Sequence, residues 1–155
     1  MKDIRPRRLR VNSSMRNLTR ETRISGDSLV LPLFIKEGNN IIEKIEALDG
    51  HYYYSHDKLP FAVEEALNQG VSSVLLFGIP DKKDALGSGA YDDNGVVQQG
   101  IKEIKSRFPE MMVITDVCMC EYTANGHCGI VNGNRILNDE TLPFLAKIAL
   151  SHINA

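Results

Sequence analysis

The sequence predicts an α/β protein built around a parallel sheet. Three short apolar runs, at 28–35, 72–79 and 111–118, alternate with three segments in which apolar residues recur every three or four positions. Continuous apolar runs are typical of parallel strands that are covered on both faces. Strands that alternate with helices indicate β/α units whose strands lie side by side. The 155 residues suffice for one domain with its own core.

The N-terminal residues differ from the rest of the chain in charge. Eight basic and two acidic residues give 1–23 a net charge of +6, so the remainder carries −8 within a total of −2. Such a segment can bind nucleic acid or lie on an acidic neighbouring subunit. It has no aromatic residue for base stacking and only isolated apolar residues. We therefore expect no nucleic-acid binding, and an extended arm at 1–27 before a folded domain at 28–155.

Each of the first two apolar runs is followed by a segment with helical spacing. The run "SLVLPLFI" at 28–35 is bounded by turn residues, and "SSVLLFGI" at 72–79 has the same character. Pro60 suits the first turn of the helix after the first run, and Gly70 is placed to end it. The apolar residues that indicate the two helices are Leu59, Val63, Ala66 and Leu67, and then Val97, Ile101, Ile104 and Phe108.

The third unit begins with "MMVITDVC" at 111–118 and ends with a long amphipathic helix. Either Asn138 or Asp139 is placed to cap that helix, and Asp139 and Glu140 suit the positive end of its dipole. The residues predicted to form its one apolar face are Leu142, Leu145, Ala146, Ala149, Leu150 and Ile153. Long loops follow the second and third strands, and open α/β sheets and barrels place their active sites at such strand ends.

All three cysteines of the chain fall in the loop after the third strand, within "ITDVCMCEYTANGHCGIV". Cys118, Cys120 and Cys128 form the pattern C-x-C-x7-C. An odd number of cysteines, with no apolar signal segment at the N-terminus, indicates a cytoplasmic protein without a disulfide scaffold. Thiolates are soft ligands that suit zinc. Buried packing as small apolar side chains is the alternative, but the polar, glycine-bearing segment favours a metal site.

Three thiols leave the fourth zinc position undecided. Structural zinc usually has four protein ligands, whereas catalytic zinc keeps one position open. His127 could close the site, although it adjoins Cys128 and neighbouring side chains seldom converge on one ion; otherwise it faces solvent or hydrogen-bonds to a ligand. Asp116 precedes Cys118 by two residues, so in a strand both side chains would point the same way. Asp116 would position water or take up a substrate proton, or else cap the strand end.

These residues carry a resemblance to a known family. The cysteine segment resembles the zinc loop of the porphobilinogen synthases, also called δ-aminolevulinic acid dehydratases. The segments "RPRRLR", "LVLPLFIKEG", "SVLLFGIP" and "DETLPFLAKIALSH" are similar to that family in the same order, so the resemblance covers essentially the whole chain. It implies part of a (β/α)8 TIM barrel, about three β/α units. It also implies a lyase that condenses two 5-aminolevulinate molecules into porphobilinogen, with loss of two waters, in haem biosynthesis.

The resemblance assigns roles to particular residues. It implies that zinc is held by Cys118, Cys120 and Cys128 and that Asp116 acts in the active site. Some members of the family also use magnesium. Members assemble, commonly as homo-octamers, with the N-terminal arm embracing a neighbouring subunit. This arrangement explains the basic arm without nucleic acid.

The sequence departs from the family in length. Barrels of this kind need about 250 residues, so we expect this chain to be an N-terminal portion. The family's two lysines that form Schiff bases with substrate lie beyond it, as do the serine and arginines that grip the substrate. The lysines matching no catalytic motif, which we interpret as solvated surface charges, are Lys82, Lys83, Lys102, Lys105 and Lys147. We therefore expect the chain to be inactive alone.

A different class of function remains open at this point. A non-catalytic zinc-binding interaction module would have His127 as a fourth ligand and would use the basic arm to bind a partner. An exchangeable fourth position at the metal would favour the enzyme. No run approaches about 18 apolar residues, so the sequence predicts no membrane span.

Overall fold

The computed structural model describes residues 7–155 and has a five-stranded sheet at its centre, in the order β2-β3-β1-β4-β5. The strands β1 (Leu31–Lys36), β4 (Ser73–Ile79) and β5 (Met112–Thr115) are parallel neighbours. The strand β3 (Tyr52–Tyr54) pairs parallel to β1, and β2 (Ile42–Lys44) pairs antiparallel to β3. The predicted α/β class and parallel sheet are confirmed.

The strand boundaries differ from the sequence prediction in two places. Residues Gly26–Ser28 form a 3-10 turn, so the first strand begins at Leu31 and not at Ser28. The third strand ends at Thr115 and not at Cys118. The β2–β3 hairpin was missed by the sequence analysis, because each of its strands has only three residues and no clear alternation.

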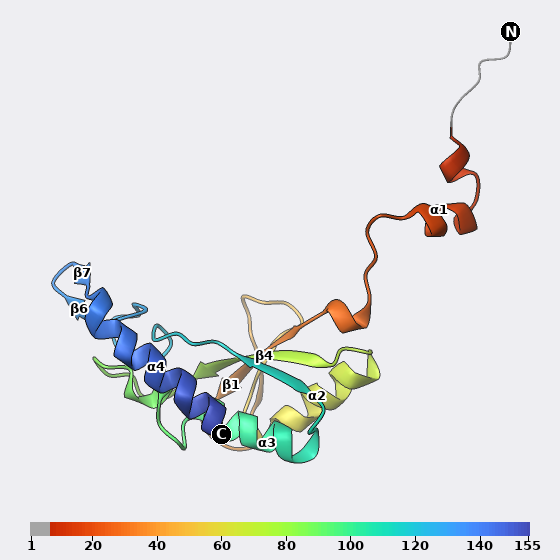
Figure 1. Cartoon of the computed structure of the whole chain (residues 1–155). Coiled ribbons are helices and arrows are strands. Elements are labelled where there is room, and N and C mark those ends of the chain that lie inside the picture. The colour runs from red at the N-terminus through yellow and green to blue at the C-terminus, as the bar shows by residue number, and fades with distance from the viewer. Residues whose placement is uncertain (1–6) are drawn as a thin grey trace, which may run out of the picture.

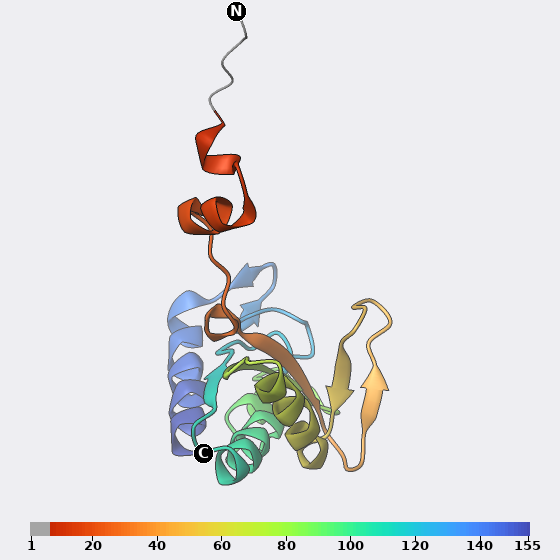
Figure 2. The same ribbon diagram turned by 90° about the vertical axis from the view of Figure 1, so that its right-hand side faces the viewer.

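Two helices cover one face of the sheet, as Figures 1 and 2 show. They are α2 (Leu59–Asn68) and α3 (Val96–Arg107), close to their predicted positions. Pro60 lies in the first turn of α2, and Gly70 adopts a φ of 79° just beyond its end, as predicted. The core lies between these helices and alternate strand residues, with fully buried side chains that include Ile35, Leu59, Val63, Val74, Leu76 and Ile104.

The opposite face of the sheet is only partly covered within the described residues. Phe34 on β1 stacks on Phe77 of β4, with ring centroids 5.4 Å apart. On β5, Met112 is 60% exposed and Ile114 is 39% exposed. Within the described residues, α2 and α3 lie on the same side of the sheet, so helices cover only one of its faces.

The last helix, α4 (Asn138–Asn154), buries only part of its predicted apolar face, through Leu145, which packs against the core. Leu142, Leu150 and Ile153 are 53%, 59% and 79% exposed, whereas Ile148 and His152 are buried. Two polar residues on the buried face have hydrogen-bond partners: Ser151 Oγ accepts from Gln98 Nε2 at 2.8 Å, and His152 Nδ1 lies 3.0 Å from Thr115 Oγ1.

The N-terminal cap of α4 also differs from the prediction. Leu137 occupies the capping position, and Asn138 and Asp139 lie inside the first turn without capping it through their side chains. The hydroxyl of Thr141 donates to the Leu137 carbonyl at a distance of 2.6 Å. Asp139 and Glu140 do lie in the first turn, where the helix dipole favours acidic side chains.

Residues 7–25 project away from the sheet (Figures 1 and 2). They contain a 3-10 turn at Arg8–Arg10 and the helix α1 (Ser13–Thr19), whose first turn is capped by Asn12. The segment projects as the predicted arm does, and it includes one short helix, α1, that the sequence analysis did not predict. Residues 1–6 of the predicted arm lie outside the described residues. No helix in the described part of the chain has the length and apolar character needed to cross a bilayer.

Candidate metal centre

The cysteine loop begins at the carboxyl end of β5, where the sequence predicted a functional site. The Asp116 N–H donates to the Leu76 carbonyl on β4 at 3.3 Å, which is the last backbone bond to the sheet. The chain then leaves the sheet and returns as a short hairpin, β6 (Val131–Asn132) and β7 (Arg135–Ile136), before α4. The loop is therefore fixed at one end by the sheet.

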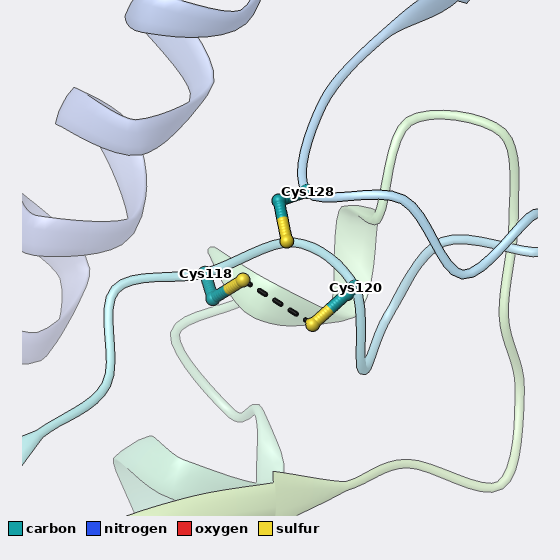
Figure 3. A group of neighbouring side chains, drawn as sticks. All are labelled: Cys118, Cys120 and Cys128. Carbon is teal, nitrogen blue, oxygen red and sulfur yellow. Dashed lines mark hydrogen bonds between the residues drawn. The ribbon is translucent and has the colours of Figure 1, made fainter. Parts of the chain in front are cut away.

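The structure brings the three predicted cysteines together (Figure 3). The sulfur atoms of Cys118, Cys120 and Cys128 all lie within 4.8 Å of one another, and the first two are 3.3 Å apart. The three thiols are free; Cys118 and Cys120 are half-buried and Cys128 is exposed. Three sulfur donors that converge from one loop could hold a soft divalent ion.

Residues between the cysteines anchor the loop in the core. Met119 and Thr123 are fully buried and Tyr122 is 6% exposed. The Tyr122 and Thr123 N–H groups both donate to the Met119 carbonyl at 2.9 Å, which closes a tight turn. The interpretation of this segment as polar and separate from the core is therefore wrong in part. Met119 and Tyr122 thus belong to the core, whereas Cys118 and Cys120 stay half-buried at its edge.

Tyr122 occupies a slot that only a glycine on β4 leaves open. A Cβ at Gly78 would overlap the Tyr122 hydroxyl and lie 2.9 Å from methyl groups of Val96 and Val97. A Cβ at Gly89 would meet the same ring at 3.5 Å, which is an ordinary contact. The loop position therefore depends on the missing side chain at residue 78.

We expect Gly78→Ala to lower the free energy of unfolding by about 1–3 kcal/mol, because overpacking displaces Tyr122 and the two valines. Chemical denaturation of the metal-free chain measures this. Gly89→Ala is the matched control, since its new methyl group fits beside the same ring. Equal stability of the two variants would contradict this account of the slot.

Asp116 and Glu121 bring carboxylates to the edge of the thiol group. Ligand atoms of Asp116, Cys118 and Glu121 lie within 4.8 Å of one another. Asp116 and Cys118 do not share a strand as predicted, because β5 ends at Thr115; the turn of the loop brings them together instead. Glu121 was missed by the sequence analysis, although an acidic residue directly after Cys120 was the signal available.

Burial affects the protonation of this cluster. It raises the pKa of Asp116, and the nearby charge of Glu121 adds to the increase. Burial also raises the pKa of the Cys118 and Cys120 thiols. A divalent cation would supply the positive charge that stabilises thiolates in this partly desolvated place. The donor set therefore fits zinc, and fits magnesium poorly because magnesium prefers oxygen ligands in octahedral geometry.

His127 lies outside both groups of converging ligands in the described structure. Its side chain is exposed, and its backbone is held by hydrogen bonds to Asn125 and Thr123. The hypothesis of a closed site with His127 as fourth ligand finds no support in this geometry.

Comparisons with known proteins identify the family of the chain. Residues 3–155 match the family described as Delta-aminolevulinic acid dehydratase. Similar curated proteins with that name come from Ruminiclostridium josui, 60% identical over 97% of this chain and 74% of the relative, and from Methanothermus sociabilis, 50% identical over 97% and 47%.

A solved structure is also similar. It is delta-aminolevulinic acid dehydratase (porphobilinogen synthase) from Toxoplasma gondii ME49 in complex with the reaction product porphobilinogen. The TM-score is 0.91 at 29% identity, over 98% of this chain and 44% of that chain. The three β/α units thus correspond to part of a TIM barrel, and the chain spans about half the length of several relatives. By sequence and by fold, the chain belongs to the delta-aminolevulinic acid dehydratase family.

Proposed function

We propose that this chain supplies the metal-binding part of a porphobilinogen synthase, the lyase that condenses two 5-aminolevulinate molecules into porphobilinogen in haem biosynthesis. The observation that carries the proposal is the convergence of three thiols at the carboxyl end of a parallel sheet. Membership of the family and the similarity to a product complex support it. Because the chain spans about half of several relatives, the proposal concerns its contribution to the whole enzyme.

Zinc is the metal that we propose for Cys118, Cys120 and Cys128. When bound, zinc supplies a Lewis acid that polarises a substrate oxygen or nitrogen. Asp116 lies beside this position with its carboxylate half-buried, where it can orient substrate and take up a proton. Some family members also use magnesium. We do not place magnesium at the three thiols, because it prefers oxygen ligands.

A chimera tests the proposal. Residues 1–155 would replace the matching part of the Methanothermus sociabilis protein, which is 50% identical to this chain. We expect the zinc-loaded chimera to convert 5-aminolevulinate into porphobilinogen, detected by its coloured adduct with p-dimethylaminobenzaldehyde. The unaltered relative is the control for the rest of the barrel. A chimera that folds and binds zinc yet makes no product would contradict the proposal.

We also propose that the whole protein is a cytoplasmic homo-oligomer, an octamer by family resemblance, in which the N-terminal segment packs on a neighbouring subunit. The free thiols suit a reducing compartment. The apolar residues exposed in the described part of this segment, residues 7–23, are Leu9, Val11 and Leu18, which are 60%, 73% and 73% exposed. Its arginines would face the acidic surface that the rest of the chain's charge predicts.

Deleting residues 1–23 from the chimera is expected to reduce its oligomer size, because the apolar and basic contacts with the neighbour are lost. Sedimentation velocity measures the change. Deleting an equally long stretch of an appended flexible tag is the control for mass alone. An unchanged association state would count against the proposed role of the segment.

A further inference from the structure

The loop after β4 pairs with the cysteine loop of residues 116–130, the metal loop. Asp84 and Thr123 form an isolated parallel bridge. The Asp84 N–H donates to the Tyr122 carbonyl at 3.2 Å, and the Ala124 N–H donates to the Asp84 carbonyl at 2.8 Å. These bonds hold the metal loop at a point between Cys120 and Cys128. These two cysteines are farther along the chain from β5 than Cys118 is.

The side chain of Asp84 holds its own loop in shape. One carboxylate oxygen accepts from the N–H groups of Leu86 and Ser88, at 2.8 and 3.1 Å, and the other accepts from the Ser88 hydroxyl. The hydrogen bonds from Ser88 lower the pKa of Asp84, so the carboxylate stays charged and remains a strong acceptor at neutral pH. The backbone of Asp84 is thereby fixed where it meets Tyr122 and Ala124.

The turn that Asp84 closes also touches the buried side of the metal loop. Gly87 adopts a φ of 60°, and an added Cβ there would lie 3.4 Å from Met119, Tyr122 and Thr123. The Thr123 hydroxyl in turn donates to the His127 carbonyl at 2.8 Å, next to Cys128. A continuous set of contacts therefore runs from the Asp84 carboxylate to the segment that carries the third thiol.

We propose that Asp84 is a positioning residue of the metal site: its carboxylate fixes the loop whose backbone sets the approach of Cys128 to Cys118 and Cys120. This inference rests on the proposed metal site. It adds the contacts that hold the three thiols close together before an ion binds. Three thiols on one flexible loop would lose conformational freedom on binding an ion, and a loop already held in place loses less. Metal ligands are commonly oriented by such outer contacts.

The test compares Asp84→Ala with Asp84→Asn and with Asp92→Ala in the full chain. Asp84→Asn keeps one carbonyl acceptor for the two N–H groups and is the conservative variant. Asp92 is the matched control, because it also accepts from a nearby N–H, that of Asn94 at 2.8 Å, but its hydrogen bonds stay within its own loop. Zinc affinity is measured by competition with a chromophoric chelator, and the absorption spectrum of bound cobalt(II) reports the coordination geometry.

We expect Asp84→Ala to weaken zinc binding about 10-fold or more and to change the thiolate–cobalt charge-transfer bands. Asp84→Asn should recover most of the affinity, and Asp92→Ala should match the unaltered chain. An Asp84→Ala chain with the affinity and cobalt spectrum of the unaltered chain would overturn the inference, even if its melting temperature fell. If that variant does not fold, Ser88→Ala, which removes the hydroxyl donor to the Asp84 carboxylate, decides by the same readouts: weaker zinc binding supports the inference and unchanged affinity and cobalt spectrum overturn it. Failure of the unaltered chain to bind zinc or cobalt would instead refute the metal site itself.

Discussion

The 155-residue chain, purified and supplied with excess zinc, will make no detectable porphobilinogen from 5-aminolevulinate. Imine formation with a ketone substrate needs an amine whose pKa is lowered inside a desolvated pocket. The family resemblance places the two lysines with that role outside this sequence. Loss of a covalent-catalysis group commonly costs several orders of magnitude in rate, roughly 8 kcal/mol for a catalytic nucleophile.

The lysines that the structure describes are unsuited to that role. Six are exposed in loops, on helices or on β2: Lys44, Lys82, Lys83, Lys102, Lys105 and Lys147. Lys58 lies in the 3-10 turn before α2, with its Nζ 5.4 Å from the centroid of the exposed Phe61 ring. Lys36 lies at the end of β1 but donates to Glu43 at 2.7 Å, and this hydrogen bond raises the pKa of the amine, opposite to what imine formation needs. The metal site and Asp116 could at most hold and polarise one substrate.

The measurement combines a product assay with borohydride trapping of any imine, followed by mass analysis of the peptides. The active chimera described above is the positive control, assayed at the same concentration and zinc content. A reduced adduct on a lysine of this chain, with turnover near that of the chimera, would show that the catalytic centre has been placed wrongly.

The second expected result is a loss of zinc affinity of more than about 100-fold on Cys120→Ser, against little change on His127→Ala. The sulfur of Cys120 lies 3.3 Å from that of Cys118, in the middle of the converging group, and a neutral serine hydroxyl is a poor zinc ligand. Zinc sites bind with about 10–16 kcal/mol, so one of about four ligands contributes roughly 3 kcal/mol, which corresponds to that factor.

His127→Ala is the matched control for this experiment. The His127 side chain is exposed and stands outside the group of converging ligands, although it adjoins Cys128. Competition titration gives both affinities, and circular dichroism shows whether the variants keep the fold. Equal losses in the two variants would indicate a site closed by three cysteines and one histidine, and would contradict the open site.

Elements with a strong local pattern could be predicted from the sequence. Helix α2 has apolar spacing, Pro60 in its first turn and Gly70 after its end, and it forms where expected. The spacing of the three cysteines, with the polar residues around them, was sufficient to predict that Cys118, Cys120 and Cys128 share one site. Both inferences depend on residues within about one turn or one loop, where the chain itself limits the possible geometry.

The face that α4 buries could not be predicted in this way. Its apolar residues Leu142, Leu150 and Ile153 are exposed, and Ser151 and His152 are buried. The hydrogen-bond partners that make this burial possible are Gln98 on α3 and Thr115 on β5, far away in the sequence. A polarity pattern on one helix carries no information about such partners.

The sequence by itself determined the α/β class, three β/α units and a cluster of three thiols after the third strand. Only the tertiary structure decided what surrounds and positions those thiols: the slot at Gly78 for Tyr122, the carboxylate of Glu121, and the pairing of Asp84 with the metal loop. The physical reason is the distance along the chain over which each kind of information acts. Helix and strand periodicity records burial over a few residues, whereas Asp84 and Thr123 become neighbours only when β4 and β5 pair and bring their following loops to the same end of the sheet.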